Sequence, residues 1–157
     1  MEIEETIVQK LLERGITVTT AESCTGGLLA GRILNVAGAS EVYREGYITY
    51  ANEAKERILG VRHETLENFG AVSRQTAEEM VRGAAKIADS RTALSTTGIA
   101  GPGGGTPEKP VGLIYVACYV DGMVRVKELH LSGTREENRH ETVEQALQLF
   151  NEMLSLN

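Results

Sequence analysis

The chain has 157 residues and a mass of 17.0 kDa, which is the size of one ordinary domain. Apolar residues make up 41% of it and charged residues 24%, a composition typical of globular proteins rather than disordered or membrane-spanning ones. The net charge of −6 and the aromatic content of 4% argue against a nucleic-acid partner, which requires a basic surface. The acidic N-terminus is unlike a secretion signal, so we expect a cytoplasmic protein with no membrane partner.

The spacing of apolar residues predicts alternating helices and strands along the chain. Helices are predicted at residues 3–15, 28–38, 52–60, 73–88 and 134–154. Strands are predicted at residues 16–21, 46–50, 93–97, 111–120 and 123–131. Asn52 and Ser73 are the expected caps of their helices, and the run from Thr134 to Glu137 has the pattern of a capping box.

The last two strands flank Asp121 and Gly122, which is the two-residue signal of a hairpin with a type I′ turn. The alternation of Val124 and Val126 changes phase before Leu129, so we expect a β-bulge there. Strands that alternate with helices and end in a hairpin predict an α/β fold, with a mainly parallel sheet, one antiparallel strand and helices on both faces. No linker is visible, so we expect residues 1–157 to form one domain.

Three unusual segments begin where a predicted strand ends, which is where open α/β sheets bind their ligands. In the first, residues 21–27, Ser23 precedes a helix whose first N–H groups are unpaired. This arrangement suits a nucleophile beside an oxyanion site, although Ser, Thr and Gly are equally typical of a simple helix cap.

Lys55 lies in the second segment, residues 50–55, within the first turns of a predicted helix. The positive end of the helix dipole favours the neutral amine. If Lys55 is also partly buried, both effects lower its pKa towards that of a general base. The alternative is an ordinary solvated lysine on the surface.

The third segment, residues 96–112, contains all three prolines and six of the seventeen glycines. A loop of this length is usually functional or disordered, and its backbone could hold an anion or wrap around a small ligand. The sequence has neither a Walker A motif nor the glycine pattern of a dinucleotide-binding turn. A flexible surface loop is the alternative.

Other chemistry has less support. Cys24 and Cys118 form no C-x-x-C pair, and the three histidines lack metal-ligand spacing, so no metal site is predicted. Arg135 and Arg139 lie one turn apart at a helix start and could bind a phosphate, or pair with nearby glutamates. If nucleophilic catalysis occurs, a lysine is a better candidate for its base than a histidine.

Taken together, the ordered blocks of this sequence resemble the CinA C-terminal-domain family, the nicotinamide-nucleotide amidohydrolases. The blocks are TTAESCTGG (19–27), GYITYANEAK (46–55), GAVS (70–73), TGIAGPGGG (97–105) and KPVG (109–112). The resemblance implies a three-layer α/β/α fold with a mixed five-stranded sheet, and hydrolysis of nicotinamide mononucleotide to nicotinate mononucleotide and ammonia. It implies no metal or other cofactor. The sequence leaves a monomer and a homodimer open.

The resemblance also implies the residues of the active site. The catalytic set would be Ser23, Lys55, Tyr50 and Thr97. The residues expected to bind the pyridine mononucleotide are Thr25, Gly26, Gly27, Gly98, Gly101, Gly103, Arg135 and Arg139. The arginines match less well, because the stretch Gly-Thr-Arg stands here where relatives have Gly-Asp-Arg.

In the expected mechanism Lys55, directly or through the Tyr50 hydroxyl, accepts the proton of Ser23. Backbone N–H groups of residues 25–27 or 97–99 would hold the oxyanion. Cys24 is the rival nucleophile. A non-catalytic nucleotide-binding or interaction module of the same fold is the alternative function.

Overall fold

The computed structural model describes residues 1–156. In that part of the chain the helices are α1 (Ile3–Arg14), α2 (Leu28–Leu34), α3 (Asn52–Leu59), α4 (His63–Phe69), α5 (Arg74–Ile87) and α6 (Arg135–Ser155), with a 3-10 helix at Ala39–Glu41. The strands are β1 (Val18–Glu22), β2 (Tyr47–Ile48), β3 (Thr92–Gly98), β4 (Leu113–Val120) and β5 (Met123–His130). The predicted order of strands and long helices is confirmed, whereas α4 and the 3-10 helix were not predicted.

The strands form one mixed sheet in the order β2-β1-β3-β4-β5. Strand β1 pairs in parallel with β2 and β3, while the pairs β3–β4 and β4–β5 are antiparallel. Strand β4 therefore runs against the other four, but parallel and antiparallel pairs are equal in number. The prediction of a mixed α/β fold is confirmed, and the description of the pairing as mainly parallel is not, because the hairpin adds two antiparallel ladders at one edge.

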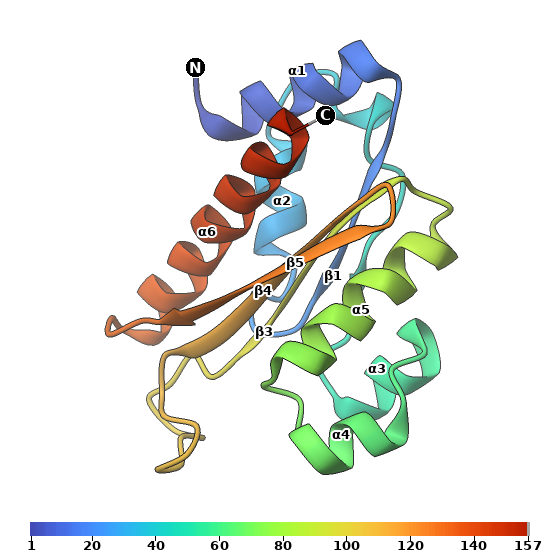
Figure 1. Ribbon diagram of the computed structural model, residues 1–157. Coiled ribbons are helices and arrows are strands. Elements are labelled where there is room, and N and C mark those ends of the chain that lie inside the picture. Colours follow the sequence, from blue (N-terminus) through green and yellow to red (C-terminus); the bar gives the residue numbers. More distant parts are fainter. Residues whose placement is uncertain (157) are drawn as a thin grey trace.

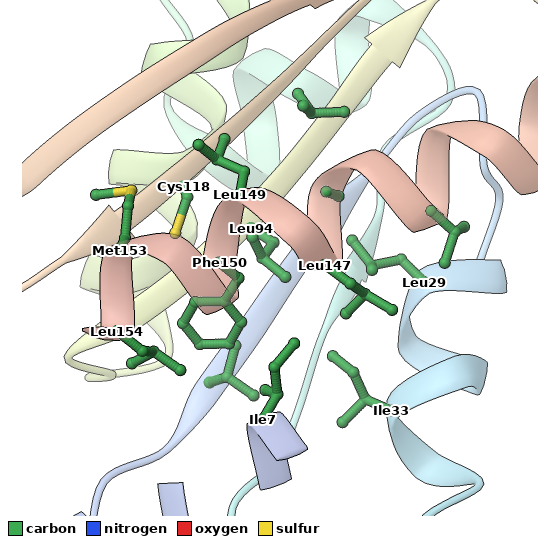
Figure 2. Close-up of a cluster of buried hydrophobic side chains, with 14 of the residues drawn as sticks. Ile7, Leu29, Ile33, Leu94, Cys118, Leu147, Leu149, Phe150, Met153 and Leu154 are labelled. Atoms are coloured by element: carbon green, nitrogen blue, oxygen red, sulfur yellow. The ribbon is translucent and has the colours of Figure 1, made fainter. Parts of the chain in front are cut away.

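Helices cover both faces of the sheet (Figure 1), with α1, α2 and α6 on one face and α3, α4 and α5 on the other. The larger core lies under α6, where Leu147 and Phe150 pack against Ile7 of α1 and Leu29 of α2 (Figure 2). Burying each such side chain contributes about 1.5–3 kcal/mol, so this layer fixes the position of α6 on the sheet. The N-terminus of α6 is thereby held beside the loops that follow β1 and β3.

The hairpin between β4 and β5 has the predicted turn, since Asp121 and Gly122 have φ values of 49° and 91°. The predicted bulge is wrong: the pairing of β4 with β5 continues without interruption from Leu113↔His130 to Val120↔Met123. The change of phase has another cause. Val126 packs on the face of α5 and Leu129 on the face of α6, so this edge strand is covered on opposite faces at its two ends.

Two of the three predicted helix caps are present. The Ser73 hydroxyl accepts the Thr76 N–H at 3.1 Å, and Thr134 forms the capping box at the start of α6. Asn52 is the first residue of α3 rather than its cap, because Ala51 occupies the cap position without a side-chain hydrogen bond. The first turn of α3 contains both Glu53, whose charge complements the helix dipole, and Lys55, whose charge does not. Among the described helices none has the length and apolarity that crossing a membrane would require.

Candidate active site

The three segments singled out in the sequence meet at one edge of the sheet, at the carboxyl ends of β1, β2 and β3. Glu22 is paired with Ile48 on one side and with Thr96 on the other. The residues that follow these three in the chain, at positions 23, 49 and 97, therefore lie in one row across the sheet. This row carries three hydroxyl side chains, those of Ser23, Thr49 and Thr97.

Lys55 reaches this row from α3. Its Nζ atom lies 3.0 Å from the Ser23 Oγ, 2.8 Å from the Thr49 carbonyl oxygen and 3.0 Å from the Tyr50 carbonyl oxygen. A protonated amine donates to all three atoms. A neutral amine has two N–H groups, which the two carbonyls accept, so its lone pair then faces the Ser23 hydroxyl.

The environment of Lys55 favours this neutral form. The residue is 1% exposed, and within residues 1–156 no carboxylate lies within ion-pair distance of its amine. Burial lowers the pKa of Lys55 to about 8, because the amine loses hydration when it is charged. The interpretation of Lys55 as a solvated surface lysine is wrong, because its amine is buried and contacts the Ser23 hydroxyl.

Burial disfavours the reactive, ionised form of Cys24, whereas it favours the reactive, neutral form of Lys55. Burial raises the pKa of the Cys24 thiol to about 11, although the Thr96 hydroxyl and Arg139 partly oppose this effect. The thiol is therefore protonated at neutral pH, and the thiolate is the form that attacks carbonyl carbons. This setting favours Ser23 over Cys24 as the nucleophile.

A buried carboxylate that the sequence analysis missed holds the turn after β1. The Glu22 Oε1 accepts hydrogen bonds from the Thr25 hydroxyl at 2.6 Å and the Leu29 N–H at 2.9 Å, and the Oε2 accepts from the Ala30 N–H at 3.1 Å. A carboxylate at this end of α2 also complements the helix dipole. The only signal in the sequence is an acidic residue at a strand end just before a glycine-rich helix start.

Further hydrogen bonds from residues 25–27 also stabilise this turn. The Gly27 N–H donates to Glu22 Oε1 at 3.2 Å, and the Gly26 N–H donates to the Ser23 carbonyl at 3.1 Å. Thr25 is fully buried and its hydroxyl also lies 2.8 Å from the Thr96 hydroxyl. The Thr25 hydroxyl and the N–H groups of Gly26 and Gly27 thus stabilise the turn after β1, residues 23–27, which we call the nucleophile turn.

The hydroxyls of Tyr50 and Thr97 have hydrogen-bond partners other than Ser23 and Lys55. The Tyr50 side chain is 62% exposed, and its hydroxyl accepts from Arg135 Nη2 at 3.1 Å rather than joining Ser23 to Lys55. Only the Tyr50 backbone carbonyl contacts the lysine. Thr97 is buried on the same face as Ser23, with its hydroxyl proton donated to the Ala71 carbonyl at 2.8 Å.

Beside the Ser23–Lys55 pair lies a cavity of about 200 Å³, called here the site cavity. It is lined by Cys24, Tyr50, Gly98, Ile99, Ala100, Gly101, Gly103, Gly104 and Arg135. The glycine-rich loop therefore forms a wall of the site rather than a detached surface loop. The lining of the site cavity includes Cys24, which directly follows Ser23, and Tyr50, whose carbonyl contacts the Lys55 amine. A larger cavity of about 650 Å³ near His130 and His140 has no lining residue of this kind, so we place the chemistry at the smaller one.

Several residues that line the site cavity have backbone N–H groups without an acceptor in the described part of the chain, and two of them, Cys24 and Gly98, directly follow Ser23 and Thr97 in the sequence. The Ile99 N–H donates to the Leu113 carbonyl of β4 at 3.0 Å, so the N–H of Gly98, one residue earlier, points to the opposite side, where β1 has ended. Within the described residues, neither the Gly98 N–H nor the Cys24 N–H donates to another residue. A Cβ at position 98 would lie 2.3 Å from Ile114 Cγ1, so this backbone requires glycine. Two such donors beside a nucleophile can stabilise an oxyanion.

The two arginines of α6 have different partners. Arg135 is exposed at the cavity, where Nη1 donates to the Gly101 carbonyl at 3.0 Å and Nη2 to the Tyr50 hydroxyl. Arg139 instead donates Nε to the Cys24 carbonyl at 2.9 Å and Nη2 to the Thr25 carbonyl at 3.1 Å. Arg135 is therefore accessible to a ligand in the cavity, whereas Arg139 stabilises the nucleophile turn through two hydrogen bonds.

Comparison with known proteins identifies the chain's relatives. Residues 1–154 match the family model of the CinA C-terminal domain. A competence-damage inducible protein of Clostridium novyi is 55% identical over 146 residues, which is 93% of this chain and 35% of the relative. A CinA-like protein of Kosmotoga olearia is 57% identical over 138 residues, 88% of this chain and 34% of the relative. The chain thus spans about a third of the length of these relatives.

Solved structures give the same result. The crystal structure of the competence/damage inducible protein CihA from Agrobacterium tumefaciens has a TM-score of 0.90 and 43% identity, covering 99% of this chain and 97% of the other. A CinA superfamily protein from Klebsiella pneumoniae has a TM-score of 0.95 and 33% identity with the same coverage. In both sequence and fold, the chain belongs to the CinA C-terminal-domain family.

Proposed function

We propose that this protein is an amidohydrolase that converts nicotinamide mononucleotide to nicotinate mononucleotide and ammonia, with Ser23 as nucleophile and Lys55 as general base. The observation that carries the proposal is the 3.0 Å contact between Ser23 Oγ and the buried amine of Lys55. A serine hydroxyl needs an adjacent base to attack a carbonyl carbon, and an amine with a pKa of about 8 is partly neutral at physiological pH.

In the proposed reaction the neutral Lys55 amine accepts the hydroxyl proton while Ser23 Oγ attacks the carboxamide carbon. The N–H groups of Cys24 and Gly98 donate to the oxygen that becomes negative. Removing one such donor from a hydrolase typically costs about 10²–10³ in kcat. Protonated Lys55 then gives its proton to the departing ammonia, and water hydrolyses the resulting ester of Ser23.

The site cavity is smaller than most ligand pockets, which measure roughly 300–1,000 Å³. We place the ring that carries the carboxamide inside it and the ribose phosphate at its mouth. Arg135 supports this placement, because its two hydrogen bonds leave further N–H groups of the guanidinium to bind a phosphate. The Tyr50 ring, exposed at the same mouth, offers an aromatic face.

The direct experiment is to incubate pure protein with nicotinamide mononucleotide in excess EDTA and to measure ammonia and nicotinate mononucleotide. Within residues 1–156 no group of three or more metal-ligating side chains is assembled, and the proposed chemistry uses none. Product release in EDTA supports the proposal. Activity that disappears with chelation and returns with Zn²⁺ or Mg²⁺ contradicts it, and binding of the nucleotide without turnover would support a non-catalytic module instead.

A further inference from the structure

Thr49 carries a hydroxyl that the chemistry described so far does not use. The residue is 0% exposed, and its Oγ1 is the buried side-chain oxygen or nitrogen atom that finds no hydrogen-bond partner in the described part of the chain. Folded proteins rarely leave a buried hydroxyl unpaired, and the exceptions concentrate where a water, an ion or a reacting group binds. The neighbours of Thr49 therefore indicate which group its hydroxyl binds.

The backbone places Thr49 beside Ser23. The Thr49 N–H donates to the Glu22 carbonyl at 2.8 Å, so the parallel ladder of β1 and β2 continues one residue beyond Ile48. Ile48 and Glu22 both face α2, where Ile48 lies near Gly27. Side chains alternate along a strand, so Thr49 and Ser23 both face α3, from which Lys55 arrives.

Lys55 connects the two residues. Its amine contacts the Ser23 hydroxyl at 3.0 Å and the carbonyl of Thr49 itself at 2.8 Å. The unpaired hydroxyl thus lies at the end of β2, and the site cavity is lined by residues that follow β1 and β2 and by the loop after β3, including Tyr50, the residue next to Thr49. A water held by Thr49 would be within reach of the amine that must take its proton.

We propose that the Thr49 hydroxyl positions the water that hydrolyses the acyl-enzyme. This inference rests on the proposed function. The water oxygen forms a bond to the acyl carbon and transfers one proton to neutral Lys55. The ester bond to Ser23 Oγ then breaks, and Lys55 returns that proton to the serine, which leaves a free carboxylic acid and the starting enzyme. Thr49 touches the water and not the substrate, so it is a positioning residue.

The test compares Thr49→Val with Thr49→Ser. Valine keeps the shape of threonine and removes an unpaired buried oxygen, so we expect a melting temperature equal to or above that of the wild type. We expect steady-state turnover of nicotinamide mononucleotide to fall at least tenfold in Thr49→Val. The first turnover should still release a burst of ammonia equal to the enzyme concentration, and mass spectrometry after acid quenching should detect the acyl-enzyme. Thr49→Ser, which keeps the hydroxyl, should behave like the wild type.

The possible failures are distinguishable. Wild-type protein that releases no ammonia overturns the proposed function and this inference with it. Wild-type turnover together with a Thr49→Val variant that is equally fast, or slow without a burst and acyl-enzyme, overturns the inference alone. A Thr49→Ser variant as impaired as Thr49→Val also overturns it, because the loss would then follow side-chain shape and not the hydroxyl.

Discussion

The amine of Lys55 lies 3.0 Å from the hydroxyl of Ser23, although 32 residues separate them in the chain. The two residues meet because β1 and β2 pair in parallel, which brings the turn after β1 and the helix after β2 to the same edge of the sheet. Two backbone carbonyls orient the amine before any ligand arrives. A base fixed in this way needs no rearrangement to accept the serine proton.

The pH dependence of the reaction should report this base. Burial lowers the pKa of Lys55 to about 8, and only the neutral amine can accept a proton. We therefore expect kcat/KM to rise about tenfold per pH unit below pH 8 and to level off above it. Initial rates between pH 6 and 9.5 would measure this, with Lys55→Met as the inactive control. A profile that is flat between pH 6 and 8 would argue that Lys55 is not the base.

The nucleophile can be assigned by matched alanine variants. Ser23→Ala should lower kcat by several orders of magnitude, as removal of a nucleophile does in other hydrolases. Cys24→Ala should cost far less, because burial keeps the thiol protonated at neutral pH, and any loss should reflect its place in the cavity wall. Cys118→Ala, at a buried cysteine of β4 away from the site, is the control for general effects on the core. The reverse order of effects would move the covalent chemistry to Cys24.

The lowered pKa of Lys55 should also make the free energy of unfolding depend on pH. Its pKa is about 8 in the folded protein and near the ordinary value of 10.5 in the unfolded chain. Below pH 8 both states are charged and the folded state carries the full cost of burying the charge; this cost disappears as pH rises from 8 to 10.5. Wild type should therefore gain up to about 3 kcal/mol relative to Lys55→Met over that range, at about 1.4 kcal/mol per pKa unit.

Urea unfolding of both proteins at pH 7, 8, 9 and 10 would measure the difference. Titrations of other residues cancel in the comparison, provided that the variant does not disturb them. A difference in unfolding free energy that stays constant from pH 7 to 10 would mean that the folded-state pKa of Lys55 is unshifted.

The parts of the candidate site that depend on local sequence could be predicted from the chain. Ser23 after a strand and Lys55 near a helix start could be recognised because residue type and element boundary are both visible in the chain. The hairpin turn at Asp121 and Gly122 and the cap at Ser73 follow from equally local rules.

Contacts between distant segments could not be predicted in this way. Tyr50 adjoins the lysine in sequence, but its hydroxyl turns to Arg135, 85 residues away. No role was predicted for Glu22 within the segment 21–27, because the three amides that donate to its carboxylate belong to the turn and to α2 and come together only in the fold. The expected bulge in β5 failed for the same reason, because the helices on each face, and not the strand itself, decide which of its residues are buried.

The two arginines of α6 should separate into a ligand contact and a structural brace. Arg135 borders the site cavity, so Arg135→Ala should raise KM for nicotinamide mononucleotide by about tenfold or more, which corresponds to one charge-assisted contact of about 1.5–3 kcal/mol. Nicotinamide riboside lacks the phosphate, so its reaction, however slow, should be almost unchanged. Arg82→Ala, at an exposed arginine of α5, is the control for loss of a positive charge.

Arg139→Ala should behave differently, because Arg139 binds the carbonyls of Cys24 and Thr25 next to the nucleophile. Loosening that turn should lower kcat for the mononucleotide and the riboside by similar factors and should also lower the melting temperature. Arg139→Lys keeps the positive charge but loses the planar guanidinium that donates from two separate nitrogens, so an intermediate loss is expected. If Arg139→Ala instead raises only the KM of the mononucleotide, Arg139 is a phosphate ligand, and its contacts with the turn must break when substrate binds. If Arg135→Ala affects both substrates equally, the phosphate must be held elsewhere, and the amides of residues 101–105 are then the next candidates.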